Sequence, residues 1–356
     1  MNLFSPIVGL DFINLGIFTH SNTQFPGKVV LKNRIYQKPI PGKLNLPLAK
    51  AKGSKQFMSS SKPLIIVLLG PTASGKTALG IEIAEHLGLE IHNVDSRQVY
   101  MDMDIGTAKP SQEQQKRIRH FLIDLKPPNE KMTMHDFHKT ARVSLDNALN
   151  KTNVGLLVGG SGLYLKALTS GLCPPSIPPE SSFRKQLHDI GQEQCYQLLQ
   201  SCDPLSAKTI APSDSVRTTR ALEVFYATGQ SKTSLQSSKP PPWRLLELGL
   251  NPSNLNDRIA QRTENIFQNG LIEETEHLIG KFGKELPLLN TIGYAEASQM
   301  IDGKLPLNDA IFQTNKRTKQ FAKRQKTWFR GQHNPKWLNE KNPLSEALSL
   351  IHNVIR

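Results

Sequence analysis

Unbroken runs of apolar residues form the clearest pattern along the chain. Residues 64–69 read LIIVLL and residues 154–158 read VGLLV, and a glycine-containing turn follows each run. A continuous apolar run of this length is typical of a strand buried on both faces of a parallel sheet. Residues 89–94, LEIHNV, alternate as a further strand would. These strands predict a parallel sheet whose turns share one edge, where ligands bind in doubly wound folds.

The turn after the first run carries a phosphate-binding pattern. Residues 70–77, GPTASGKT, fit G-x-x-x-x-G-K-[ST] without a mismatch. Backbone N–H groups of such a loop converge on an anion, Lys76 adds a cation, and the Thr77 hydroxyl can ligate Mg²⁺. The pattern therefore predicts a diphosphate site, but it does not say whether the diphosphate belongs to a nucleotide. The predicted site residues are Gly70, Pro71, Thr72, Ala73, Ser74, Gly75, Lys76 and Thr77.

Helical patterns follow these strands. Leu79, Ile83 and Leu87 recur every four residues and form one apolar stripe, and Gly88 can end that helix. Residues 171–185 are rich in proline and mark a break, after which helical patterns dominate. We therefore predict an α/β fold over residues 62–356: a P-loop parallel sheet with flanking helices, plus an inserted, mainly helical domain at about residues 125–200.

Polar side chains stand where two further strands end. Asp95 follows the alternating strand, and Ser161 follows the Gly159-Gly160 turn after the second apolar run. The shared edge of the sheet would bring both side chains towards the phosphate-binding turn. Each residue also has a local alternative, because Asp often caps the segment that follows it and Ser is a common helix cap.

Basic residues gather on predicted helices of the second half. Residues 308–330 form a predicted helix on which five cations recur at steps of three and four. Like charges along one helix face repel, so a polyanionic partner is the simplest reason to tolerate them. Trp328 and Phe329 on this helix could anchor it to the core or stack on bases. The five cations are Lys316, Lys319, Lys323, Lys326 and Arg330.

Overall charge supports the same partner class. The 356 residues carry a formal net charge of +14, which favours nucleic acid or an anionic surface. Residues 1–61 hold eight of the basic residues and one acid, Asp11, and lack sustained periodicity. This basic leader is expected to be a spurious extension, with translation starting at Met58, or an organelle transit peptide. No apolar run is long enough for a membrane span, and three cysteines without CxxC spacing favour neither disulfides nor a zinc site.

Four stretches together resemble the tRNA dimethylallyltransferases: GPTASGKT, DSRQVYMDMDIGTAKP, VGGSGLYLKAL and AKRQKTWFR. The resemblance covers residues 62–340. It implies that the loop binds the diphosphate of dimethylallyl diphosphate, and that the acceptor is the exocyclic amine of the adenosine 3′ of the tRNA anticodon. Asp95 would act as general base, while Lys76, Arg262 and Mg²⁺ at Thr77 stabilise the leaving diphosphate. Thr72 and Ser161 would complete the catalytic set.

The resemblance also implies a surface for the tRNA anticodon stem-loop. Its residues would be Asp95, Ser96, Arg97, Gln98, Ser161, Arg184, Arg217, Arg220, Lys323, Arg324, Gln325, Lys326, Trp328 and Arg330. Ser161 stands where the family usually has Thr, and Asn290 and Ala295 replace residues that are often basic in relatives. The single His120 receives no role. The chain lacks a C-terminal zinc finger, so a monomeric enzyme of bacterial or plastid type is expected, located in the cytoplasm, or in a plastid or mitochondrion if the leader is a transit peptide.

Three other functions stay open from the residues. A prenyltransferase acting on free adenine nucleotide would use the same donor site but would not need the long basic helix. A P-loop kinase would be expected to carry an acidic residue where residues 156–160, LLVGG, end in glycine. A non-catalytic RNA-binding module would leave the phosphate-binding turn unexplained.

Overall fold

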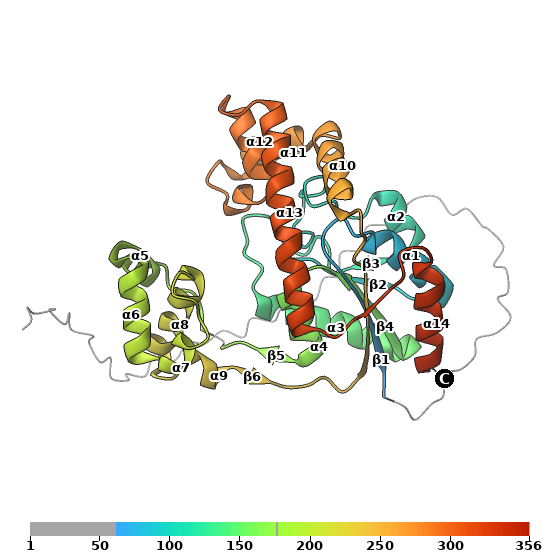
Figure 1. The fold of residues 1–356 in the computed structure, drawn as a ribbon, viewed down its shortest axis with the longest axis horizontal. Coiled ribbons are helices and arrows are strands. Elements are labelled where there is room, and N and C mark those ends of the chain that lie inside the picture. The colour runs from blue at the N-terminus through green and yellow to red at the C-terminus, as the bar shows by residue number, and fades with distance from the viewer. Residues whose placement is uncertain (1–61, 176, 356) are drawn as a thin grey trace, which may run out of the picture. The chain divides into compact units, whose positions relative to one another are not determined.

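A six-stranded parallel sheet, flanked by helices, forms the core of the α/β part of the described residues (Figure 1). The computed structural model describes residues 62–175 and 177–355, so the leader predicted at residues 1–61 lies outside the described residues. The strand order is β3-β2-β4-β1-β7-β8, which confirms the predicted sheet. The strands are β1 Leu64–Leu69, β2 Ile91–Val94, β3 His120–Phe121, β4 Val154–Gly159, β7 Arg244–Gly249 and β8 Lys336–Trp337.

Helices cover both faces of this sheet. Ile65 and Val67 of β1 share a buried cluster with α3 and α4, whereas Leu64 and Ile66 share one with α1 and α14. Successive side chains of a strand point to opposite faces, so an unbroken apolar strand supplies both clusters. The helices are α1 Lys76–Leu87, α3 Met134–Thr152, α4 Gly162–Ser170 and α14 Pro343–Ile355, and the short α2 Gln112–Arg117 precedes β3.

A helical insertion interrupts the chain between β4 and β7. It is entered and left through a two-stranded antiparallel ribbon, β5 Leu172–Cys173 with β6 Ser237–Ser238. Its helices are α5 Ser181–Ile190, α6 Gln192–Cys202, α7 Pro204–Ala207, α8 Ser215–Thr228 and α9 Lys232–Leu235. Buried side chains including Leu187, Leu199 and Leu222 give it an apolar cluster of its own.

These bounds differ from the predicted insertion at about residues 125–200. Residues 134–170 form α3, β4 and α4, which belong to the sheet and its covering layer. The insertion begins after the proline-rich break and continues past residue 200. The difference has a physical cause, because the apolar strand at residues 154–159 requires sheet partners on both sides.

A second group of helices follows β7. It comprises α10 Leu255–Gln268, α11 Leu271–Phe282, the 3₁₀ turn η1 Pro287–Asn290, α12 Tyr294–Ile301 and α13 Leu307–Gln332. The long helix α13 packs on α10 and α12 along one part of its length and on α4 along another. The basic helix predicted at residues 308–330 is therefore confirmed as a helix, and it joins this group to the edge of the sheet where the strands end.

Candidate active site

The phosphate loop, residues 70–77, connects the buried strand β1 to α1. Gly75 adopts a left-handed conformation with φ of 92° at the start of α1, which a residue with a Cβ adopts only at a cost. The Lys76 ammonium folds back over the loop and donates to the Pro71 carbonyl at 2.6 Å and to Ser74 Oγ at 3.5 Å. The side chain thus stands where a bound anion would sit among the loop N–H groups.

Asp95 and Ser161 meet beside this loop, at the ends of β2 and β4. Ser161 Oγ accepts the Ser96 N–H at 2.8 Å and does not cap its own helix α4. Asp95 Oδ1 accepts the N–H groups of Arg97 at 2.8 Å and Gln98 at 3.3 Å. Asp95 therefore does two things: its Oδ1 caps the turn that follows it, and its side chain lines the cavity beside the phosphate loop.

A cavity of about 460 Å³ collects these side chains, a volume suited to a small ligand. It is walled by the phosphate loop, the ends of β2 and β4, α10 and α13. Every residue of the predicted catalytic set lines it: Thr72, Lys76, Ser161, Asp95 and Arg262, together with Thr77. Ser96, Arg97, Gln98, Arg324 and Gln325 of the predicted tRNA set line it as well.

Two half-buried cations, Lys76 and Arg262, share this cavity with the Asp95 carboxylate. Burial lowers the pKa of Lys76 to about 7, the neighbouring Arg262 acts in the same direction, and Asp95 opposes both effects. Burial also lowers the pKa of Arg262, and Asp95 again opposes it. The charged forms of both bases are thus strained by loss of water and by mutual repulsion, which a bound dianion would relieve.

Gln325 of α13 bridges the two glycine turns. Its Oε1 accepts the Thr72 N–H at 2.8 Å, and its Nε2 donates to the Gly160 carbonyl at 2.8 Å. The residue is 8% exposed. Both ends of its amide are therefore bonded within the protein, and a contact between Gln325 and tRNA stays a prediction.

The rest of α13 separates into a buried and an exposed side. Phe329 is fully buried, and Trp328 packs against Gly162 at the start of α4, where a Cβ would lie 2.2 Å from the ring. Both aromatic residues therefore anchor the helix. Lys323 and Arg330 are exposed, and the five-cation stripe forms no ion pair with an acid of the described residues. Phe321 and Arg324 stand at the cavity wall.

The three arginines predicted in the insertion do not line the cavity. Glu223, 3% exposed, accepts from Arg184 at 2.6 and 2.7 Å and from Arg220 at 3.1 Å. Arg220 also donates to the Pro175 and Ile177 carbonyls, so this cluster ties α8 to the segment that follows β5. Arg217 pairs with Asp214 at the surface and keeps a side chain that is 58% exposed.

Several cavity residues were not singled out from the sequence. The loop of residues 104–108 forms a wall, and its Thr107 carbonyl accepts Arg262 at 3.3 Å and Gln98 at 3.3 Å. His120 also lines the cavity: its Nδ1 donates to the Ile118 carbonyl at 2.8 Å, and its Nε2 is buried without a partner among the described residues. Residues 106–110, GTAKP, belong to one of the family-like stretches and could have drawn attention to this loop, but the sequence alone does not indicate what the loop does.

Within the described ranges, no cluster of three or more His, Cys, Asp or Glu side chains could hold a metal ion. Thr77 lines the cavity beside the loop, and its hydroxyl is a hard oxygen ligand that fits Mg²⁺ when phosphate oxygens and waters supply the remaining positions. A search of the same residues finds no helix long and apolar enough to cross a membrane.

Comparison with known proteins agrees with this arrangement. The family model described as IPP transferase matches residues 98–332. The chain belongs to the IPP transferase family. A curated tRNA dimethylallyltransferase of Prochlorococcus marinus is 60% identical over 298 residues, covering 84% of this chain and all of the relative. Another, from a Synechococcus species, is 56% identical over 299 residues, covering 84% of this chain and all of that relative.

Solved structures extend the comparison. The tRNA delta(2)-isopentenylpyrophosphate transferase of Staphylococcus epidermidis matches with a TM-score of 0.60 and 31% identity, covering 82% of this chain and all of that chain. A eukaryotic dimethylallyltransferase described as acting on tRNA matches with a TM-score of 0.69 and 25% identity, covering 82% of this chain and 79% of that chain. The predicted family and the predicted α/β fold are both confirmed.

Proposed function

We propose that this IPP transferase family member transfers the dimethylallyl group of dimethylallyl diphosphate to tRNA. The acceptor is the exocyclic amine of the adenosine 3′ of the anticodon, in tRNAs that read codons beginning with U, and the product is diphosphate. The observation that carries the proposal is the single cavity in which Lys76, Arg262 and Asp95 meet beside the phosphate loop. The curated relatives named tRNA dimethylallyltransferase support the same reaction.

The cations act on the donor. Negative charge grows on the diphosphate as its bond to the dimethylallyl carbon breaks, and the electron pair of that bond leaves with it. Lys76 and Arg262 already line the cavity, so they stabilise this charge with little reorganisation. Thr77 would hold Mg²⁺ here, which supplies further charge neutralisation on the phosphate oxygens.

Asp95 acts on the acceptor. The lone pair of an adenine amine is delocalised, so the amine is a weak nucleophile and gains from proton removal as it attacks. The new bond joins the amine nitrogen to the dimethylallyl carbon, and the proton of the nitrogen passes to the Asp95 carboxylate. The Asp95 turn, closed by the Arg97 and Gln98 N–H groups, holds the carboxylate in the cavity for this role.

The exposed cations of α13 bind the tRNA backbone. Lys323 and Arg330 are exposed on the helix whose buried Gln325 and exposed Arg324 line the cavity. A polyanion bound along this helix would therefore lie beside the entrance through which a flipped base reaches Asp95. In the insertion, Arg217 is the most exposed of the three arginines and is available to a phosphate. Arg184 and Arg220 pair with Glu223, which fixes the position of their side chains.

A competition between acceptors tests the proposal. The full chain is incubated with labelled dimethylallyl diphosphate and Mg²⁺, with unmodified tRNA, AMP and ATP present together, and Asp95→Asn serves as the inactive control. Label is expected in tRNA with the wild type and not with the variant. Label in AMP or ATP would identify an adenylate prenyltransferase instead. Absence of label in every acceptor, with phosphate transferred from ATP to a small molecule, would identify a kinase.

A further inference from the structure

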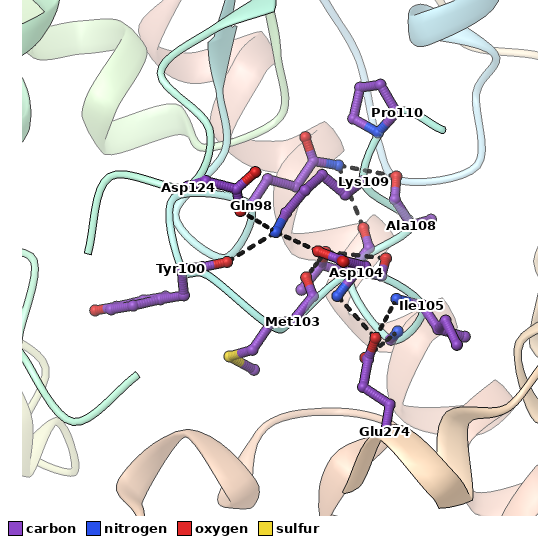
Figure 2. Close-up of polar contacts among 12 residues, drawn as sticks. Gln98, Tyr100, Met103, Asp104, Ile105, Ala108, Lys109, Pro110, Asp124 and Glu274 are labelled. Atoms are coloured by element: carbon purple, nitrogen blue, oxygen red, sulfur yellow. Dashed lines mark hydrogen bonds and ion pairs between the residues drawn. The ribbon is translucent and has the colours of Figure 1, made fainter. Parts of the chain in front are cut away.

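A carboxylate outside the cavity holds one cavity wall from behind (Figure 2). Glu274 of α11 accepts three consecutive backbone N–H groups: Asp104 at 2.9 Å and Ile105 at 2.7 Å on Oε2, and Gly106 at 3.0 Å on Oε1. Its Oε1 also accepts the Tyr294 hydroxyl at 2.6 Å. Four donors thus converge on two oxygens, the full capacity of an ionised carboxylate in this geometry.

The loop packs closely on a buried ring beside this carboxylate. Tyr294 is 1% exposed, and a Cβ on Gly106 would lie 2.5 Å from its ring. Burial raises the pKa of Tyr294, so its hydroxyl stays protonated and remains a donor to Glu274. The ring and the carboxylate therefore fix the loop by contact and by hydrogen bonds together.

The loop behaves as one unit because its two ends are joined. Lys109 donates to the carboxylate of Asp104, to Asp124 at 2.5 Å and to the Tyr100 carbonyl at 2.8 Å. The Lys109 side chain is 3% exposed. Lys109 thus ties the loop to itself, while Glu274 bonds to it from α11 (Figure 2).

The loop in turn holds two cavity residues. The Thr107 carbonyl accepts Arg262 at 3.3 Å, and the carbonyls of Thr107 and Ala108 accept the Gln98 amide at 3.3 and 3.0 Å. Gln98 is also the residue whose N–H bonds to Asp95. A movement of the Thr107 carbonyl would therefore displace both the guanidinium that faces the donor and the turn that carries Asp95.

We infer that Glu274 is a positioning residue for the transfer reaction: it sets the Thr107 carbonyl and, through it, orients Arg262 and Gln98. This inference rests on the function proposed above. The cluster needs an acceptor-only group at this position, because three backbone N–H groups and the Tyr294 hydroxyl all donate to it. In Glu274→Gln, at nearly constant volume, the side-chain NH₂ must face two of the four donors whichever way the amide is turned.

The test compares variants of the full chain in the tRNA transfer assay. Glu274→Gln is expected to lower kcat by about 10- to 100-fold, because a small misplacement of a catalytic group has this effect, while the KM for tRNA changes by less than about twofold. Tyr294→Phe removes one donor, retains the ring, and is expected to lower kcat by about threefold. Glu276→Gln, exposed on the same helix, is the matched control and should behave as the wild type.

A double-mutant cycle separates positioning from general loss of structure. Because Glu274 orients both Arg262 and Gln98, Glu274→Gln should lower kcat by a clearly smaller factor in an Arg262→Ala background than in the wild type. Additive effects of the two substitutions, or an unchanged kcat in Glu274→Gln, would overturn the inference. If Glu274→Gln does not fold, Tyr294→Phe replaces it, and its effect on kcat is measured with and without Arg262→Ala.

Binding of inorganic pyrophosphate, measured by calorimetry, keeps this test independent of the transfer assay. Glu274→Gln should weaken pyrophosphate binding by about tenfold in the wild-type background and not in Arg262→Ala. Equal losses in both backgrounds would contradict the inference even if no acceptor is prenylated. A wild type that prenylates no acceptor contradicts the proposed function alone.

Discussion

Gln325 Oε1 accepts the backbone N–H of Thr72 at 2.8 Å, which joins the basic helix α13 directly to the phosphate loop. The second half of the same amide donates to the Gly160 carbonyl at the neighbouring turn. The helix whose exposed side is proposed to bind tRNA is therefore bonded, on its buried side, to both turns of the donor site. One side chain thereby links the proposed tRNA-binding helix to the proposed donor site.

Replacing this amide tests the coupling. Gln325→Leu keeps an approximate volume and leaves the Thr72 N–H and the Gly160 carbonyl without partners, at a cost of about 1–3 kcal/mol for each buried group. We expect the Kd for pyrophosphate to rise at least about tenfold. Calorimetry on the full chain measures it, with exposed Gln320→Ala on the same helix as control. An unchanged Kd in Gln325→Leu would show that the bridge does not support the loop.

The pKa of Lys76 predicts how donor binding depends on pH. In the free protein this pKa is about 7, so the ammonium loses its proton as the pH rises through 7. A bound diphosphate favours the charged form and raises the pKa, so binding takes up a proton above pH 7. The affinity for pyrophosphate should be greatest near and below pH 7 and fall by up to about tenfold per pH unit above it.

Calorimetry at pH 8 in two buffers of different ionisation enthalpy measures this proton uptake. Lys76→Arg, which stays charged over the whole range, should take up no proton at this position. Equal proton uptake by the wild type and this variant would mean that another group is responsible.

If the exposed cations of α13 contact tRNA, removing them should weaken tRNA binding in a salt-dependent way and leave diphosphate binding unchanged. The double substitution Lys323→Ala and Arg330→Ala should weaken tRNA binding and reduce the salt slope of the binding constant by about one per lost phosphate contact. The Kd for pyrophosphate should not change. Lys151→Ala is the matched control, because Lys151 stands at the end of α3 that leads into the start of β4, opposite the cavity edge of the sheet. A salt slope equal to the wild type would place the tRNA elsewhere.

The buried cluster around Glu223 predicts a local loss of stability. Glu223→Ala leaves Arg184 and Arg220 without their common acceptor. The cost is below the about 3–5 kcal/mol of a fully buried pair, because water can reach the Arg184 side chain, which is 39% exposed. We expect faster amide hydrogen exchange in α5, α6 and α8, and unchanged exchange in the sheet. Exposed Glu193→Ala on α6 should resemble the wild type. Unchanged exchange in the insertion of Glu223→Ala would contradict the role assigned to this cluster.

The strands and most residues of the predicted catalytic set that line the cavity could be placed from the sequence, because their signals are local. β1 and β4 are continuous apolar runs, and the phosphate loop has a fixed spacing between β1 and α1. Parallel strands share one edge for their turns, so Asp95 and Ser161 were placed correctly beside Lys76. The position of Arg262 followed from family resemblance, since nothing in its own helix distinguishes it from Arg258.

Other features depend on contacts between distant parts of the chain. Gln325 lies 253 residues from its partner Thr72, and Glu274 lies about 170 residues from the loop that it holds. The pairing of Arg184 and Arg220 with the buried Glu223 could not be predicted. The sequence spacing of two arginines on one helix face is the same whether they face solvent or a carboxylate. The insertion was placed too early because the helices α3 and α4, which cover the sheet, have the same periodicity as those outside it.

Nucleoside analysis of tRNA treated with the full chain tests the central claim most directly. Unmodified tRNA that reads codons beginning with U is incubated with dimethylallyl diphosphate and Mg²⁺, digested, and examined by mass spectrometry, with diphosphate release measured in the same reaction. The account predicts one dimethylallyl group on the adenosine 3′ of the anticodon and one diphosphate released for each group transferred. Unmodified adenosine at that position, with dimethylallyl diphosphate left intact, would contradict it.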